Sequence, residues 1–259
     1  FIFNGYPMRP RTHLLISVLI GLFILILLNP CLSNVQGSTG NYSQGLTSTK
    51  EVIRNVGPEV RHGLKEQCEA SGLEYPPDRL WLIGLKKEGK LEVWGKNCST
   101  TWRLITSYFL MASSGDRGPK LREGDKQIPE GVYSVVSLNP NSDYHLSMKL
   151  NYPNGFERRM ARKAGRQDLG GNIFIHGSYV SAGCLALGNE NIEKLFVLVH
   201  DSDPSNTRVL IAPYDFQEVS EIRVPNGAPP WTSVLYQWLW DMMKRIRSIQ
   251  DQSVHKMPE

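Results

Sequence analysis

Short segments rich in β-branched and aromatic residues fill the chain between residues 80 and 152. Clusters of Gly, Pro and Asn separate them, which is the pattern of strands joined by turns. The segments are Leu80–Leu85, Leu91–Trp94, Trp102–Met111, Val132–Val136 and Tyr144–Tyr152. Apolar and polar residues alternate strictly in the last segment, so one face of this strand is expected to be buried. Two later strands are expected at Ile173–Ile175 and Val209–Ala212, and these elements together predict a mainly β fold.

Helices are expected before, within and after these strands. Pro58–Ala70 carries apolar residues four positions apart and predicts a helix that starts at the proline. Asn191–His200 has the three- and four-residue spacing of a second helix. Pro229–Asp251 predicts a C-terminal helix that packs on the sheet, with docking to a partner or membrane surface as the alternative. Its apolar stripe consists of Trp231, Leu235, Trp238, Met242 and Ile249.

The composition is that of a globular protein and excludes some function classes. Hydrophobic residues make up 41% and charged residues 21% of the 259 residues, which is enough apolar material for a real core. Four cysteines are too few for a small disulfide scaffold, and a net charge of +4 does not favour a dedicated polyanion binder. The sequence also lacks the glycine-rich motifs that bind phosphate or dinucleotides.

The first 37 residues have the features of an export signal. No Lys, Arg, Asp or Glu occurs between Thr12 and Thr49, and all but two of the fifteen residues in Leu14–Leu28 are strongly apolar. Arg9 and Arg11 precede this stretch. A basic flank before a short apolar core predicts a signal peptide. An uncleaved membrane anchor is the main alternative and a buried core helix the lesser one, because spanning a bilayer takes about 20 apolar residues.

A histidine and a cysteine lie close together in the segment Ile173–Leu187. His176 ends an apolar strand, Gly177 follows it, and Cys184 comes eight residues after the histidine, behind Gly183. Histidine accepts a thiol proton near neutral pH and, once protonated, lowers the pKa of a neighbouring thiol. Glycine-rich turns can present N–H groups to a developing oxyanion. The pair is sufficient for acyl transfer through a thiol, although a buried cysteine and a structural histidine would fit the same pattern.

This segment resembles the active-site motif of L,D-transpeptidases with a YkuD-type (ErfK/YbiS-like) catalytic domain. That family carries HG, then a loop, then SxGC, which match His176–Gly177 and Ser181–Cys184. Further matching stretches are Gly118–Tyr133, Tyr144–Asn154 and Asp168–His176. Only seven residues separate the histidine from the cysteine, and Ala186 replaces the arginine usual after the cysteine. Both departures resemble a short-loop Gram-negative branch of the family.

The resemblance implies a β-sandwich catalytic domain with a flanking N-terminal helix, a helix after the cysteine and a C-terminal helix. Cys184 would be the nucleophile and His176 its base, with the Gly177 carbonyl orienting the imidazole. The N–H groups of Gly183 and Cys184 would line the oxyanion site, next to Ser181 in the same loop. No metal or organic cofactor is expected for this chemistry.

Several polar residues are candidates for binding a substrate rich in carboxylates. His145 lies on the polar face of its strand, and Lys120 and Arg122 lie in the loop before Pro129. An exposed histidine and a solvated loop are the alternatives at these positions. A basic cluster follows, and it is expected to form a solvated face or to contact anionic cell wall rather than nucleic acid. Its members are Arg158, Arg159, Arg162, Lys163 and Arg166.

The function implied by the resemblance is that of an exported, periplasmic cysteine enzyme acting on peptidoglycan stem peptides. Cys184 would attack the carbonyl of a meso-diaminopimelate residue, and an amine or water would resolve the thioester. L,D-transpeptidase is the primary expectation. The alternatives are a murein hydrolase or amidase that releases a peptidoglycan-bound outer-membrane lipoprotein, and a catalytically silent wall-binding module. A sortase-like enzyme would need Arg208 as its arginine, which the HG and SxGC arrangement does not suit.

The expected organisation has five parts. Residues 1–37 are a signal peptide or membrane anchor, 38–49 a flexible linker, 50–78 an N-terminal helical segment, 79–213 the catalytic domain and 214–259 a C-terminal helical extension. Cys31 would leave with a cleaved signal, so Cys68 and Cys98 would either form a disulfide or both stay free.

Overall fold

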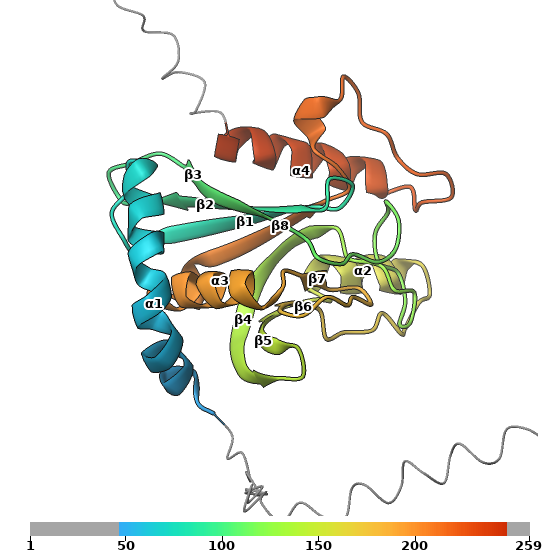
Figure 1. The fold of residues 1–259 in the computed structure, drawn as a ribbon. Helices are drawn as coiled ribbons and strands as arrows, with labels where there is room; N and C mark the ends of the chain where they lie inside the picture. The colour runs from blue at the N-terminus through green and yellow to red at the C-terminus, as the bar shows by residue number, and fades with distance from the viewer. Residues whose placement is uncertain (1–46, 248–259) are drawn as a thin grey trace, which may run out of the picture. The chain divides into compact units, whose positions relative to one another are not determined.

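A single eight-stranded sheet forms the centre of the protein, in the order β3-β2-β1-β8-β4-β5-β6-β7. The computed structural model describes residues 47–247 (Figure 1). The strands are β1 (Arg79–Leu85), β2 (Lys90–Lys96), β3 (Arg103–Phe109), β4 (Gly131–Ser142), β5 (His145–Leu150), β6 (Phe174–His176), β7 (Leu185–Ala186) and β8 (Thr207–Ala212). The pairs β1–β8 and β6–β7 are parallel and the other pairs are antiparallel.

Four α-helices accompany the sheet within the described part of the chain. They are α1 (Thr49–Ala70), α2 (Gly155–Lys163), α3 (Asn189–Asp201) and α4 (Thr232–Arg247), with 3-10 turns at Pro204–Asn206 and Phe216–Glu218. The predicted mainly β fold is therefore confirmed, with helices before the sheet, after Cys184 and at the C-terminal end. None of the helices in residues 47–247 has the length and apolar character needed to cross a bilayer.

The long strand β4 connects two arms of the sheet. Its first residues, Gly131–Ser134, pair with β8, and the residues from Val135 onward pair with β5. The register with β5 shifts between Val135 and Ser137, which marks a bulge, and bulges bend a strand. Figure 1 shows α3 between the arm that contains β1, β2 and β8 and the arm that contains β5 and β6.

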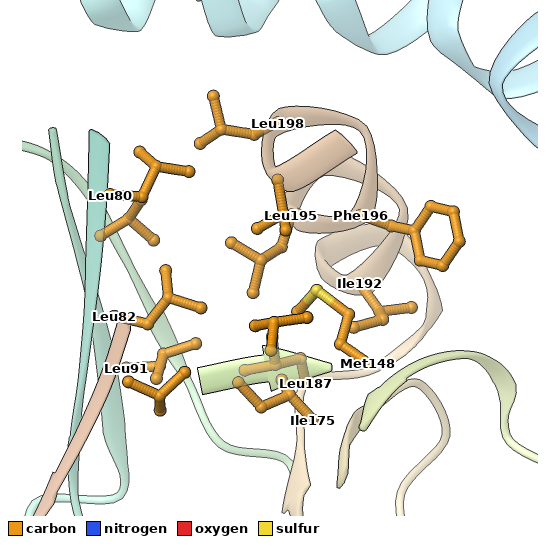
Figure 2. Close-up of a cluster of buried hydrophobic side chains, with 14 of the residues drawn as sticks. Leu80, Leu82, Leu91, Met148, Ile175, Leu187, Ile192, Leu195, Phe196 and Leu198 are labelled. Carbon is orange, nitrogen blue, oxygen red and sulfur yellow. The ribbon is translucent and has the colours of Figure 1, made fainter. Parts of the chain in front are cut away.

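The main core fills the space between these two arms. Leu80, Leu82 and Leu91 of the first arm face Leu195 and Leu198 of α3 (Figure 2). Met148, Ile175 and Leu187 add side chains from the second arm. Because this core contains residues from both sides of the His176–Cys184 segment, its packing fixes the backbone that carries them.

A second core lies on the other face of the first arm, beneath α4. Ile83 and Leu210 contribute from the strands, and Tyr236 and Leu239 contribute from the helix. The expected C-terminal helix is thus present and packs on the sheet. Its predicted stripe was partly wrong: Leu235 is buried, but Trp238 is 47% exposed. The buried face continues through Met243 and Ile246, and Ile249 lies outside the described residues.

Helix α1 begins nine residues earlier than the proline predicted to start it. Ser48 and Glu51 form a capping box, in which the Ser48 side chain accepts from the Glu51 N–H and the Glu51 carboxylate accepts from the Ser48 N–H. This arrangement satisfies two otherwise unpaired N–H groups at the helix start. Pro58 is exposed inside the helix, and Val52 and Ile53 before it join the core. The expected linker 38–49 therefore ends in a helix start, while its residues before 47 lie outside the described part, as do residues 1–37.

Other differences from the sequence-based expectations are local. Strand β4 extends six residues beyond Val136, β5 begins at His145 rather than Tyr144, and the two-residue strand β7 was not predicted. Cys68 is buried and Cys98 is exposed, and both are free thiols. The disulfide considered for this pair is therefore absent from the structure.

Candidate active site

The parallel pairing of β6 with β7 brings His176 and Cys184 together. Ile175 pairs with Leu185 and His176 with Ala186, so Cys184 lies just before β7 and beside Phe174. By this register the two residues are two positions apart, which is about 7 Å along the strands. Among the described contacts, Sγ of Cys184 donates to the carbonyl oxygen of Asn172 at 3.8 Å and does not bond to the imidazole.

His176 is only 2% exposed, and its imidazole is held by the next residue. Its Nδ1 lies 2.6 Å from the carbonyl oxygen of Gly177. Since a carbonyl only accepts, Nδ1 carries the proton and Nε2 keeps a free lone pair. The contact expected for the Gly177 carbonyl is thus present. Burial lowers the pKa of His176, although the bond to Gly177 opposes this, and the lowered pKa favours the neutral ring.

Tyr144 covers the imidazole. Its ring centroid lies 4.6 Å from that of His176, with the planes tilted by 32°, while 44% of the tyrosine stays exposed. The Tyr144 carbonyl also approaches Gly177 closely, because a Cβ at Gly177 would lie 2.7 Å from that oxygen. Only glycine fits this position without displacing the Tyr144 backbone. Sequence reasoning assigned Tyr144 to an apolar face and missed its contact with His176.

The thiol of Cys184 is a weaker acid than the sequence suggested. Burial raises the pKa of Cys184 above its ordinary value, and the Phe174 N–H and the Lys120 charge only partly offset this effect. The resting arrangement therefore does not favour the lowered thiol pKa that a protonated histidine beside the cysteine would produce. A neutral thiol beside a neutral imidazole avoids the cost of burying an ion pair.

Two serine hydroxyls hold the loop before β7. The N–H of Gly183 donates to Oγ of Ser114 at 2.7 Å, and the N–H of Cys184 donates to Oγ of Ser181 at 3.2 Å. Ser181 also donates to the Cys184 carbonyl at 2.8 Å, and its hydroxyl lies 3.2 Å from that of Ser114. Both N–H groups expected to line the oxyanion site therefore already have a hydroxyl acceptor. Ser114 was not found from the sequence.

Lys120 is buried in an ion pair rather than free to bind a substrate. Its Nζ lies 2.6 Å from Oδ1 of Asp125 and 2.9 Å from the carbonyl oxygen of Arg122. Asp125 also accepts from the N–H groups of Leu121, Arg122 and Gln127, which rigidifies the loop. Lys120 thus contributes positive charge near Cys184, and the Arg122 side chain stays exposed.

His145 belongs to a neighbouring contact rather than to the His176–Cys184 pair. Its Nε2 lies 2.6 Å from Oε1 of Glu193 on α3, and the residue is exposed. Its backbone adopts φ 73°, a region that non-glycine residues rarely enter. The residue directly follows Tyr144 in the chain, so the Glu193 contact helps to hold the turn that carries the tyrosine. No group of three or more His, Cys, Asp and Glu side chains suited to a metal ion occurs in residues 47–247.

Comparison with known proteins identifies similarity over the region that contains this site. Residues 84–211 match the family described as YkuD, the L,D-transpeptidase catalytic domain. The chain is 31% identical over 182 residues to YafK of Escherichia coli (strain K12), which is named as a candidate L,D-transpeptidase, and the alignment covers 70% of this chain. YafK of Escherichia coli O157:H7 matches equally. The chain spans 63% of the length of these relatives.

Solved structures also match this chain, at lower similarity. Pgp2, the helical cell shape determining protein from Campylobacter jejuni, superimposes with a TM-score of 0.43 and 22% identity over 64% of this chain and 55% of its own. Bd1075 from Bdellovibrio bacteriovorus gives a TM-score of 0.40 and 23% identity over 66% of this chain and 56% of its own.

Proposed function

Since this chain carries a catalytic domain of the YkuD L,D-transpeptidase family, we propose that it is a cysteine acyltransferase acting on the peptide stems of peptidoglycan. Cys184 is the nucleophile and His176 the base in this proposal. The observation that supports it most is the β6–β7 pairing, whose register sets Cys184 two positions from His176, an imidazole protonated on Nδ1 by its contact with the Gly177 carbonyl. The chain spans only part of its relatives, so substrate and reaction both belong to the proposal.

In the first half-reaction, Sγ of Cys184 forms a bond to the substrate carbonyl carbon while its proton passes to Nε2 of His176. The thiol must first exchange its hydrogen bond to the Asn172 carbonyl for one to the imidazole. The C–N bond then breaks, and the leaving amine takes the proton from His176. A thioester on Cys184 and a neutral imidazole remain.

The oxyanion of this step is stabilised by the N–H groups of Gly183 and Cys184. Both donate to serine hydroxyls at rest, and a hydroxyl both donates and accepts as it rotates. Ser114 and Ser181 can therefore give up the two N–H groups to a stronger, charged acceptor and turn toward other partners. The site keeps its donors satisfied until a substrate arrives.

In the second half-reaction, an amine or water forms a bond to the thioester carbonyl carbon while its proton passes to Nε2 of His176. The C–S bond then breaks, and Sγ of Cys184 takes the proton back from the imidazole. Transfer to the amine of another stem is the primary proposal, in line with the family to which the domain belongs. Because water is abundant, an amine acceptor prevails only when the protein orients it. Lys120 is occupied by Asp125, so orientation of an acidic substrate requires other cations.

Location in the periplasm is part of the same proposal and rests on the pattern from Arg9 to Leu28. An exported enzyme meets peptidoglycan, whereas a cytosolic one does not. Cell fractionation followed by N-terminal sequencing of the purified protein tests this point. Recovery of the intact chain from the cytosol would overturn both the location and the substrate.

The enzymatic proposal is tested with purified protein and a stem tetrapeptide at rising concentrations of an amine acceptor. Mass spectrometry should detect an acyl-enzyme on Cys184 and an amine-linked product. Cys184→Ala and His176→Gln should abolish both, whereas Cys98→Ser, which removes an exposed thiol outside the site, should leave them unchanged. Cleaved product without any amine-linked product would replace transfer with hydrolysis, and no acyl-enzyme at all would reject the catalytic proposal.

A further inference from the structure

A cavity of about 500 Å³ lies beside α2 and the segment that leads from α2 to β6. Its wall includes three arginines, Arg158, Arg162 and Arg166, and two carboxylates, Glu123 and Asp168. The sequence predicted only a solvated basic face or a contact with anionic cell wall for these arginines. The structure instead gathers three of them around one concavity.

The three guanidiniums differ in how firmly they are held. Arg158 donates from Nη1 to the Pro153 carbonyl, and Arg166 donates from Nη1 to the Leu121 carbonyl at 2.6 Å. Arg162 has no hydrogen-bond or ion-pair partner within the described part of the chain. Arg158 and Arg162 are four residues apart on α2 and so share a face. Each guanidinium has five N–H donors, so most of the donors in the cavity remain open to a ligand.

The two carboxylates decide which class of ligand fits. Glu123 and Asp168 are joined through the backbone, since the Glu123 N–H donates to the Asp168 carbonyl at 3.3 Å. Neither carboxylate has an ion-pair partner among residues 47–247. The cavity wall therefore carries three positive and two negative groups. A polyanion bound to the arginines would place further negative charge against Glu123 and Asp168, which would repel it. The same wall suits a ligand with a carboxylate and an ammonium group close together.

The cavity is close to the nucleophile along the chain. Gly170 lines the cavity, and Asn172, two residues later, accepts from Sγ of Cys184. Two residues span at most about 7 Å of chain. A peptide rises about 3.3 Å per residue when extended, so three or four residues connect a reacting carbonyl at Cys184 with a charged end in the cavity.

We propose that this cavity binds the charged end of a peptide substrate, through carboxylate contacts from Arg162, Arg158 and Arg166 and ammonium contacts from Glu123 and Asp168. The proposal rests on the proposed function, because it takes the reacting carbonyl to lie at Cys184. The cavity would also supply an anchor for a substrate carboxylate. Such an anchor is otherwise missing, because Ala186 stands two residues after Cys184 and Lys120 is already paired with Asp125. The free Arg162 guanidinium is the strongest single contact.

The test is a binding measurement on the Cys184→Ala protein, which cannot turn over its ligand. The probe is a synthetic stem tetrapeptide with free carboxylates and amine, compared with the same peptide after amidation of its carboxylates. Arg162→Gln should weaken binding of the free peptide about tenfold, since charge-assisted hydrogen bonds contribute of this order. Amidation should cause a similar loss, and the two losses should not add, because they remove the same contact.

Arg159→Gln is the matched control. Arg159 lies between Arg158 and Arg162 on α2. It is exposed and lines a different cavity with Val234 and Trp238. Binding by this variant should equal that of the parent protein. If Arg162→Gln binds the free peptide as well as Arg159→Gln does, the cavity is not the anchor.

The catalytic assay separates this inference from the proposed function. With Cys184 intact, Arg162→Gln should raise KM for the free peptide about tenfold, an estimate taken from the same charge-assisted contact, and should leave alkylation of Cys184 by iodoacetamide unchanged. Turnover with an unaltered KM would reject the cavity and keep the enzyme. Arginine-dependent binding without any acyl-enzyme would keep the cavity and reject the proposed chemistry.

Discussion

The ring of Tyr144 lies over the imidazole of His176, with 4.6 Å between their centroids. The tyrosine precedes β5 and the histidine ends β6, so the antiparallel pairing of these strands produces the contact. The tyrosine removes one face of the imidazole from water while its own outer part stays exposed. This burial keeps the histidine neutral and ready to accept a proton, which connects an apolar contact to the proposed base.

Tyr144→Ala should lower kcat and change its pH dependence. Because burial lowers the pKa of His176, removal of the covering ring should raise this pKa toward its ordinary value of about 6.5. Activity requires the neutral ring, so the acid limb of the kcat profile should move to higher pH. Tyr144→Phe keeps the ring and should retain the parent profile. An acid limb at the same pH in both variants would contradict the role given to Tyr144.

The pH dependence of Cys184 alkylation should show that the thiol loses its proton only at high pH. Burial raises the pKa of Cys184, and iodoacetamide reacts with the thiolate, so the rate should be half-maximal above pH of about 8.5. His176→Gln should leave this midpoint nearly unchanged, because the resting thiol donates to Asn172 and not to the imidazole. A midpoint below pH 7 that rises in His176→Gln would instead demonstrate a thiolate–imidazolium pair. Cys98→Ser in all samples removes the exposed thiol that would compete among residues 47–247.

The sequence was informative where contacts are local. Short β segments predicted the strands, and the spacing of His176 and Cys184 predicted one site, because β6 and β7 join over a short loop. Glu51, three residues after Ser48, is also a local capping signal. The residues before it are rich in Gly, Ser and Asn, which favours a linker and obscures this signal.

Contacts distant in sequence could not be found in this way. Ser114 reaches Gly183 because the chain after β3 runs beside β7, where Ala112 bridges to Ala186. Nothing in the local pattern around Ser114 indicates that neighbour. Lys120 illustrates a second limit: a basic residue in a loop looks the same whether it is solvated or, as here, buried against Asp125.

The two serines should contribute unequally to catalysis. Ser181 holds both the N–H and the carbonyl of Cys184, whereas Ser114 holds only the N–H of Gly183 and touches Ser181. Ser181→Ala should therefore lower kcat more than Ser114→Ala does, since it frees the nucleophile's own backbone. Each loss should lower the free energy of unfolding by about 1 kcal/mol, the usual net value of a hydrogen bond. Steady-state kinetics and urea unfolding measure both effects, and a larger kcat loss in Ser114→Ala would contradict this order.

Asp201 should connect α1 to α3 in a pH-dependent manner. Burial alone would raise the pKa of Asp201, but hydrogen bonds from Arg61, Tyr75 and His200 outweigh it and lower the pKa to about 2. The carboxylate lies 2.7 Å from Nε of Arg61 and 2.6 Å from the Tyr75 hydroxyl, and its side chain is only 12% exposed. Because the folded pKa of Asp201 lies below the unfolded value of about 3.9, the charged carboxylate stabilises the folded protein at a pH above this unfolded value. A shift of this size corresponds to roughly 2 kcal/mol.

Asp201→Asn should therefore lower the free energy of unfolding by roughly 2 kcal/mol at pH 7, where the wild-type carboxylate is charged in both states. As the pH falls from about 5 toward 2, the parent protein loses this contribution, so the difference between the two proteins should shrink. Asp241→Asn is the control, because Asp241 on α4 accepts a hydrogen bond from Gln237 and has no ion-pair partner among the residues that the structure describes. Urea titrations at pH 7, 4 and 3 measure these differences. A constant difference across the three pH values would show that the carboxylate charge does not hold α1 against α3.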